Sequence, residues 1–214
     1  MENKVKLQQV LPDEIEKRSF EIISQEIGNV KLDPLEEPII KRVIHTSADF
    51  DYLENLVFSP GAAELAMEAV VKGATIVTDT NMAMAGINKK AVEKFGGRVV
   101  CFMADEDVRA SAKADGTTRA AASMKKAAAI EGPAIFAIGN APTALAALYE
   151  MIAEGTLRPA LIIGVPVGFV NVVEAKELIM KTDIPYIVAR GRKGGSNVAA
   201  AICNAILYQC GGRE

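Results

Sequence analysis

The chain contains one histidine, His45, which follows the segment Lys41-Arg42-Val43-Ile44. An imidazole changes its charge near neutral pH, so it is suited to donate or accept a proton in a reaction. Neighbouring cations such as Arg42 lower its pKa, and a bound polyanion would raise the pKa again. A lone histidine is more often structural than catalytic, but its place at the end of an apolar segment and beside cations favours a proton donor. A metal site built from several histidines is excluded.

A second candidate site is the basic, glycine-rich segment Arg190-Gly191-Arg192-Lys193-Gly194-Gly195-Ser196-Asn197, which we expect to lead from a strand into a helix. Free N–H groups at a helix N-terminus attract anions, and nearby arginine and lysine side chains strengthen this attraction. Similar helix starts are predicted at Gly139-Asn140-Ala141-Pro142-Thr143 and at Ser59-Pro60-Gly61, where ordinary capping is the simpler interpretation. The three cations of the first segment instead favour an anion site, and hence an acidic small-molecule ligand.

Two further polar segments have both a structural and a functional interpretation. Asp105-Glu106-Asp107 follows a predicted strand and could bind a metal, but acidic residues also favour the first turn of a helix, which is the stronger interpretation. Thr80-Asn81-Met82-Ala83-Met84 is either a helix start that faces the core or a soft surface for a flat apolar ligand. The motifs GxxxxGK[ST] and GxSxG do not occur, and the glycines at 191, 194 and 195 do not form a dinucleotide fingerprint. A nucleotide cofactor is therefore disfavoured.

These segments must be positioned by short Val- and Ile-rich runs that alternate with longer Ala-rich stretches of helical period. Because the runs are almost entirely apolar, they predict strands of a parallel sheet that is covered on both faces. The alternation predicts a doubly wound fold with three layers, α/β/α, and a mostly parallel sheet. The expected strands are Ala74–Thr78, Val99–Met103, Ala134–Ile138, Leu161–Val165 and Tyr186–Ala189, and the expected helices are Pro60–Lys72, Met84–Phe95, Thr117–Ala129, Ala141–Ala153, Val172–Lys181 and Ser196–Tyr208.

The first 45 residues have a different pattern. Pro12–Ile27 predicts a charged amphipathic helix, and Val30–Pro38 predicts an irregular connector. Ile39–His45 predicts a short additional strand or an extended arm. We therefore expect one domain over residues 1–214, in which residues 1–45 pack on the α/β core as an N-terminal helix and arm.

The composition argues against several classes of protein. A net charge of −3 and an aromatic content of 5% are unsuited to nucleic-acid binding. Three cysteines with no CxxC pair argue against a disulfide framework or a zinc cluster. No apolar run reaches the length of a membrane span, and the charged N-terminus lacks the apolar core of a signal peptide. The expected protein is cytoplasmic and binds neither nucleic acid nor membranes.

Seven segments, in collinear order over nearly the whole chain, resemble the motifs of the precorrin-8X and cobalt-precorrin-8 methylmutases. A single motif of this kind would be weak evidence, whereas seven in order are strong evidence. The segments are Arg42-Val43-Ile44-His45-Thr46-Ser47-Ala48-Asp49, Phe58-Ser59-Pro60-Gly61, Thr78-Asp79-Thr80-Asn81-Met82 with Ala85-Gly86-Ile87, Thr117-Thr118-Arg119-Ala120, Ile138-Gly139-Asn140-Ala141-Pro142-Thr143-Ala144-Leu145, Gly164-Val165-Pro166-Val167-Gly168-Phe169-Val170 and Arg190-Gly191-Arg192-Lys193-Gly194-Gly195-Ser196.

The resemblance implies a flavodoxin-like domain, a homodimer, a tetrapyrrole substrate and no cofactor. It implies an isomerase of corrin-ring biosynthesis, which moves a methyl group from carbon 11 to carbon 12 and gives hydrogenobyrinic or cobyrinic acid. By similarity, His45 is the proton donor/acceptor, and Ser19 and Arg42 contact the substrate. Because they lie on matching loops or in the basic segment, we add Asn81, Arg119, Asn140, Arg192 and Lys193 as further substrate-binding candidates.

Two other functions are compatible with the sequence. One is a phosphate-binding enzyme of the same fold, which would use the segment from Arg190 to Ser196. The other is a corrinoid carrier without turnover, which would need no ionisable group over the ring. His45 is therefore the residue that discriminates between an enzyme and a carrier.

Overall fold

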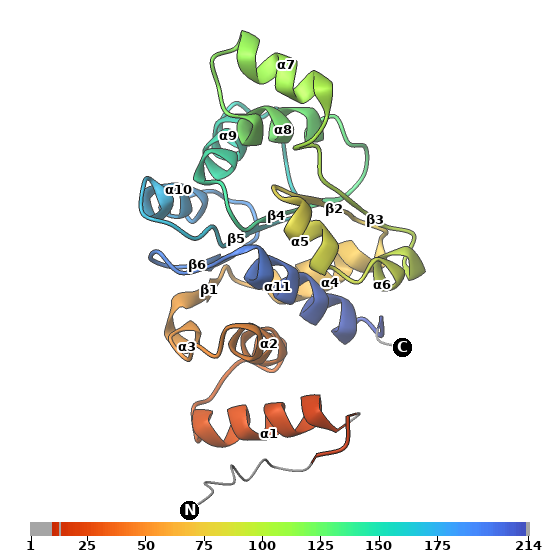
Figure 1. Ribbon diagram of the computed structural model, residues 1–214, viewed down its shortest axis with the longest axis vertical. Coiled ribbons are helices and arrows are strands. Elements are labelled where there is room, and N and C mark those ends of the chain that lie inside the picture. Colours follow the sequence, from red (N-terminus) through yellow and green to blue (C-terminus); the bar gives the residue numbers. More distant parts are fainter. Residues whose placement is uncertain (1–9, 13, 213–214) are drawn as a thin grey trace, which may run out of the picture.

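The computed structural model describes residues 10–12 and 14–212, and it is built around a six-stranded sheet (Figure 1). The strand order is β1-β6-β5-β4-β2-β3, and all neighbours are parallel except β1, which is antiparallel to β6. The predicted mostly parallel α/β sheet is thus confirmed. The strands are β1 (Leu56–Phe58), β2 (Thr75–Thr78), β3 (Arg98–Val100), β4 (Ala134–Ile138), β5 (Leu161–Gly164) and β6 (Tyr186–Ala189).

The strands are apolar throughout because helices cover both faces of the sheet. Along β4, Ile135 and Ala137 pack into one core, while Ala134, Phe136 and Ile138 pack into the other. One core includes residues of α2, α4 and α11, and the other includes residues of α8, α9 and α10. This is the three-layer arrangement that the sequence predicts.

The helices agree with the prediction in most places. The predicted helix Met84–Phe95 is instead two short helices. The acidic segment at 105–107 begins a helix, as the preference of acidic residues for the first turn of a helix indicated. The helices are α1 (Ile15–Ile27), α2 (Glu37–Ser47), α3 (Tyr52–Asn55), α4 (Ala62–Val71), α5 (Asn81–Gly86), α6 (Lys89–Lys94), α7 (Glu106–Ala114), α8 (Arg119–Ala127), α9 (Pro142–Ala153), α10 (Val172–Ile179) and α11 (Ser196–Gln209).

The prediction of a strand or an extended arm at Ile39–His45 is wrong, because this segment forms most of helix α2. Its buried residues are Ile39, Ile40, Val43 and Ile44, a spacing that places them on one side of a helix. Pro38 lies in the first turn, where a proline is well tolerated. His45 therefore lies at the C-terminal end of a helix and not at the end of a strand.

Helix α2 packs between α11 and α1, so that the N-terminal helices form an additional layer on one side of the molecule (Figure 1). Ile23 and Ile27 of α1 belong to the same core as α2 and α11. Within the described residues, none of the helices is both long enough and apolar enough to span a bilayer.

Candidate active site

The site begins with one face of helix α2, which carries Arg42 and His45 three residues apart. Phe20 of helix α1 stacks on the imidazole of His45, with ring centroids 5.2 Å apart and an interplanar angle of 17°. The Arg42 guanidinium carbon lies 4.7 Å from the centroid of the Phe20 ring and 5.3 Å from that of the Tyr208 ring. Arg42 also forms an ion pair with Glu16. Three elements, α1, α2 and α11, thus fix the two side chains.

The surroundings of His45 favour its neutral form. Partial burial lowers the pKa of His45 below the ordinary value of 6.5, and the nearby charge of Arg42 lowers it further. The position in the last turn of α2 acts in the opposite direction, since the C-terminal end of a helix favours a cation. In the absence of a ligand, the imidazole is therefore mostly neutral at pH 7 and ready to take up a proton.

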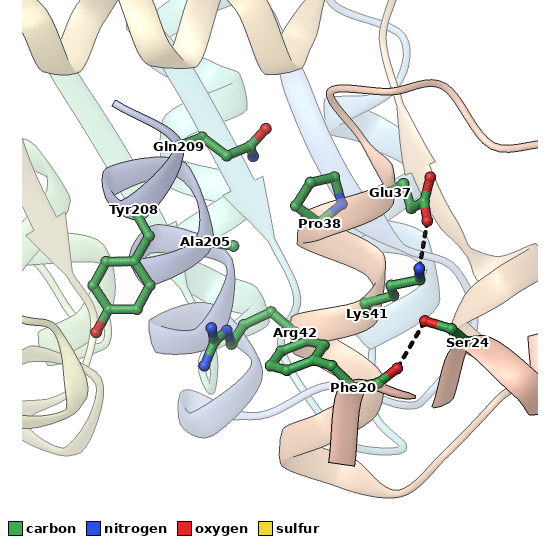
Figure 2. A pocket seen from close by; sticks show the side chains of 9 residues that line it. All are labelled: Phe20, Ser24, Glu37, Pro38, Lys41, Arg42, Ala205, Tyr208 and Gln209. Carbon is green, nitrogen blue, oxygen red and sulfur yellow. Dashed lines mark hydrogen bonds and ion pairs between the residues drawn. The ribbon is translucent and has the colours of Figure 1, made fainter. Parts of the chain in front are cut away.

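Three cavities surround this cluster. The largest, of about 460 Å³, lies beside Arg42, Phe20 and Tyr208, and Figure 2 shows the guanidinium of Arg42 directed toward the two rings. A second, of about 300 Å³, borders His45, Ser19 and Ile44. A third, of about 280 Å³, is shared by Arg42 and His45. Arg42 is thus shared by the first and third cavities and His45 by the second and third, while Phe20 lines the first.

The wall opposite His45 in the third cavity comes from the start of α11 and the end of α5. Asn197, Ala200, Ala201 and Asn204 line it together with Gly86. The helices approach closely here, since a Cβ atom on Gly86 would lie only 2.9 Å from the Cβ of Ala200. Most of these side chains are small, and the Asn204 amide accepts a hydrogen bond from the N–H of Asn88 and donates one to the carbonyl of Gly86. This wall therefore combines glycine and alanine with the amide groups of Asn197 and Asn204.

The basic loop that precedes α11 is tied to the end of α2. The ammonium group of Lys193 lies 2.6 Å from a carboxylate oxygen of Asp49 and 2.5 Å from one of Asp51. These carboxylates raise the pKa of Lys193, so its charge is permanent but already paired. The guanidinium of Arg192 lies 5.4 Å above the ring of Phe169, which is exposed. Arg190 and Arg192 are therefore the cations of this loop that face solvent without a carboxylate partner among the described residues.

The helix start after β4 already holds an anion from the chain itself. The buried carboxylate of Asp79 accepts hydrogen bonds from the backbone N–H groups of Gly139 (2.9 Å), Asn140 (2.8 Å) and Ala141 (2.7 Å). Burial raises the pKa of Asp79, whereas the three N–H donors lower it. The backbone N–H groups at the start of this segment are therefore occupied by a carboxylate of the chain itself, in line with the structural interpretation that the sequence favoured over an anion site. The segment Ser59-Pro60-Gly61 does not cap helix α4 through a side chain. The Ser59 hydroxyl instead accepts a hydrogen bond from the N–H of Tyr186.

Comparison with known proteins decides the family. The precorrin-8X methylmutase family model matches residues 14–209. The chain belongs to this family. It is 45% identical to the cobalt-precorrin-8 methylmutase of Priestia megaterium over 92% of its own length and 88% of that protein, and 46% identical to that of Salmonella typhimurium over 92% and 95%. The crystal structure of the precorrin-8X methyl mutase of Thermus thermophilus matches with a TM-score of 0.85 and 42% identity, over 92% of this chain and 98% of that one.

Family membership makes the chain a methylmutase, an isomerase of cobalamin biosynthesis. It also explains why the seven collinear segments cluster at loops and helix ends around the sheet. The predicted group formed by Ser19, Arg42 and His45 comes together, because Ser19 lines the same cavity as His45. The Ser19 hydroxyl donates to the carbonyl of Ile15, 3.0 Å away.

The remaining predicted residues lie further along the methylmutase fold. Asn81 is the exposed first residue of α5, and its neighbour Thr80 hydrogen-bonds Ser196 at 2.8 Å, which joins α5 to the basic loop. Arg119 and Asn140 are exposed at the starts of α8 and α9, which a hydrogen bond between Thr118 and Thr143 draws together. These two residues belong to the layer on the other face of the sheet from α2.

Sequence analysis missed four residues that shape the site: Phe20, Asp79, Lys176 and Tyr208. Only Asp79 carried a signal, since it directly follows a strand whose residues are all buried. The structural interpretation of the acidic segment at 105–107 is confirmed, because Glu106 and Asp107 lie in the first turn of α7. Asp105 and Asp107 also form ion pairs with Lys126. In the described part of the chain, no cluster of histidine, cysteine and acidic residues could hold a metal ion.

Proposed function

We propose that this methylmutase moves a methyl group from carbon 11 to carbon 12 of precorrin-8X or cobalt-precorrin-8, giving hydrogenobyrinic or cobyrinic acid, with His45 as the proton donor/acceptor. The observation that supports this most directly is the His45–Arg42–Phe20 cluster between adjoining cavities. It combines a titratable group, a cation and an aromatic surface. A flat macrocycle with carboxylate side chains needs these three features.

The proposed methyl shift requires that the protein hold the macrocycle in position and transfer one proton. The methyl shift is formally a 1,5-sigmatropic migration, which requires the correct tautomer of the macrocycle rather than a nucleophile. The carboxylates of a bound substrate would raise the pKa of His45, which burial and Arg42 hold low in the free protein. Substrate binding thus charges the imidazole at the moment when it has to donate a proton. General acid catalysis of this kind contributes about 10²- to 10⁴-fold in rate.

The ring carboxylates need several cationic or hydrogen-bonding partners. Arg42 is held in place by two aromatic rings and an ion pair, so its guanidinium loses little freedom on binding. Arg192 extends from the basic loop, and Ser19 stands beside His45. Asn81, Arg119, Asn140 and Lys193 stay candidates for further contacts. Lys193 would share its charge with Asp49 and Asp51, as Arg42 would share its charge with Glu16.

The test is a single-turnover measurement on His45→Ala. We expect the rate to fall by about 10²-fold or more, while the melting temperature changes little because the imidazole is exposed. His45→Gln serves as the matched variant, since it keeps a polar side chain but cannot exchange a proton at neutral pH. A variant that turns over at the wild-type rate would remove His45 from the mechanism. Wild-type protein that binds the corrinoid without any spectral change on incubation would indicate a carrier.

We also propose that the protein is a cytoplasmic homodimer and that its tetrapyrrole substrate is its only partner besides a second copy of itself. The presence of cobalt in the substrate is a separate question, because metal-free and cobalt-containing rings offer the same carboxylates. Turnover assays with both substrates under anaerobic conditions would decide it.

A further inference from the structure

Lys176 of helix α10 is buried, with only 1% of its surface exposed, although it carries an ammonium group. The ammonium nitrogen donates to the carbonyl oxygen of Gly191 at 2.8 Å and to that of Lys193 at 2.9 Å. Both partners are backbone carbonyls of the basic loop between β6 and α11. A buried charge is costly unless it is well hydrogen-bonded, so these two contacts favour the conformation in which the loop lies against α10.

Three further backbone hydrogen bonds hold the same loop. Its first N–H group, that of Arg190, donates to the carbonyl of Asn55 at 2.7 Å. The N–H of Gly168 donates to the carbonyl of Arg192 at 3.1 Å, and the N–H of Gly195 donates to the carbonyl of Val165 at 2.9 Å. The two ends of the loop and its middle carbonyl are thus fixed by backbone, whereas the carbonyls on either side of the middle depend on Lys176.

Gly194 shows how tightly the loop is seated. Its φ is +156°, and a Cβ atom there would lie 2.1 Å from the carbonyl oxygen of Val165. No other residue type could occupy this position without moving the backbone. The loop therefore has one seated conformation, in which its inner side lies against β5 and α10.

The hydrogen bonds give the loop two unlike sides. The carbonyls of Gly191 and Lys193 accept hydrogen bonds from the buried ammonium group of Lys176, and the carbonyl of Arg192 between them accepts one from the N–H of Gly168 in the neighbouring loop between β5 and α10. The side chains of Arg190, Arg192 and Lys193 are exposed. Two carbonyl oxygens that would repel a carboxylate, those of Gly191 and Lys193, are thus directed toward Lys176 in the interior, and that of Arg192 is already hydrogen-bonded by the neighbouring loop. The ammonium of Lys176 adds a positive charge beneath that surface.

We propose that Lys176 is a positioning residue that turns the carbonyls of the 190–193 loop inward and so builds the carboxylate-binding face of that loop. The inference rests on the proposed function, in which this loop binds carboxylates of the ring. Lys176 itself does not touch the substrate. It acts through the conformation of the loop and through its charge.

The variant to make is Lys176→Met, which keeps the length of the side chain and removes the donor. Lys181→Met is the matched control, because it removes an exposed lysine just beyond the end of the same helix. Two measurements apply to each variant. Hydrogen exchange of residues 190–195 reports the order of the loop without a ligand, and spectral titration with cobyrinic acid reports the dissociation constant.

For Lys176→Met we expect faster exchange in the loop and a dissociation constant raised about tenfold, the equivalent of one lost charge-assisted contact. The dependence of binding on salt should also become shallower. A corrinoid with its carboxylates amidated should bind to Lys176→Met and to Lys181→Met with the same affinity. If Lys176→Met only damaged the fold, it would weaken the binding of this uncharged ligand as well. Lys181→Met should match the wild type in every measurement.

The outcomes separate this inference from the proposed function. Arg192→Ala tests the loop itself as a carboxylate clamp. If Arg192→Ala weakens binding but Lys176→Met leaves both exchange and affinity unchanged, the role of Lys176 is overturned and the clamp stands. If neither Arg192→Ala nor Lys176→Met changes the affinity, the loop is no clamp, and both ideas fail together.

Discussion

At the scale of single residues, the chemistry of the site depends on how Phe20 and Arg42 surround His45. The Phe20 ring excludes water from one face of the imidazole, and the Arg42 guanidinium lies against the same ring. Both effects disfavour the imidazolium in the free protein. A polyanionic ligand would reverse them, since it would neutralise Arg42 and attract a proton. The histidine is thus set to change its charge when the substrate binds.

The uniqueness of His45 makes this prediction easy to measure. Proton NMR of the imidazole ring should give a titration midpoint below 6.5 in the free protein. Arg42→Gln should move the midpoint upward, because it removes the charge that opposes protonation. Arg158→Gln, which changes an exposed arginine paired with Asp183, should leave it unchanged. Saturation with cobyrinic acid should raise the midpoint of the wild type. A free-protein midpoint at or above 6.5 would contradict this account of the site.

At the scale of elements, helix α2 shows what the sequence could and could not predict. The run of isoleucine and valine at Ile39–Ile44 favoured a strand by residue type. Its burial follows helical spacing, with the charged pair Lys41-Arg42 on the other side. Packing against α1 and α11 therefore outweighed the strand preference. The motif indicated Arg42 and His45 as candidate site residues, whereas the element that carries them was not predicted.

The central strands were predictable because both of their faces are buried, so every residue of β4 had to be apolar. The strand β1 was missed because it has only three residues and pairs antiparallel at the edge of the sheet. The partners of Asp79 and Lys176 were also out of reach. The partners of Asp79 are backbone groups at least 60 residues away in the chain, and the nearest partner of Lys176 is a backbone group 15 residues away. No side-chain pattern in the sequence marks such backbone groups.

The prediction for the secondary-structure elements concerns Asp79. Its carboxylate fixes the start of α9 beyond the C-terminal ends of β2 and β4. Asp79→Ala would leave three buried or half-buried N–H groups without their acceptor. We expect the free energy of unfolding to fall by roughly 3 kcal/mol or more, measured by urea denaturation. Asp183→Ala, which removes an exposed ion pair with Arg158, should change it by about 0.5 kcal/mol at most. Equal stability of the two variants would show that Asp79 does not hold this helix start.

The loops around Asp79 are also packed backbone against backbone. A Cβ atom on Gly139 would lie 2.7 Å from the Cα of Ser196, where α11 begins. The turn after β4 and the basic loop after β6 therefore form one rigid unit, which Thr80 joins through its bond to Ser196. Replacement of Asp79 should consequently disturb the conformation of the basic loop as well as the start of α9.

At the scale of the whole molecule, the α/β core and the N-terminal helices contribute different parts of the site. The core supplies the basic loop and the start of α11, while α1 and α2 supply Phe20, Arg42 and His45. The bridge from Lys193 to Asp49 and Asp51 joins the two parts. The site is therefore complete only when the N-terminal helices pack on α11, and mutations in that contact should affect catalysis as well as stability.

The loop between β5 and α10 motivates the last prediction, which concerns assembly. Phe169 and Val170 are 82% and 75% exposed, and Val167 is also exposed, so the loop presents several apolar side chains together. Exposed apolar patches of this kind mark interaction surfaces. We expect light scattering to give twice the chain mass of 22.8 kDa, about 46 kDa, at micromolar concentrations. Phe169→Ser should lower the mass toward that of one chain on dilution, whereas Val71→Ser, which changes an exposed apolar residue of α4, should not. A wild-type mass of one chain at every concentration would exclude the homodimer, and a stable dimer in Phe169→Ser would place its interface elsewhere.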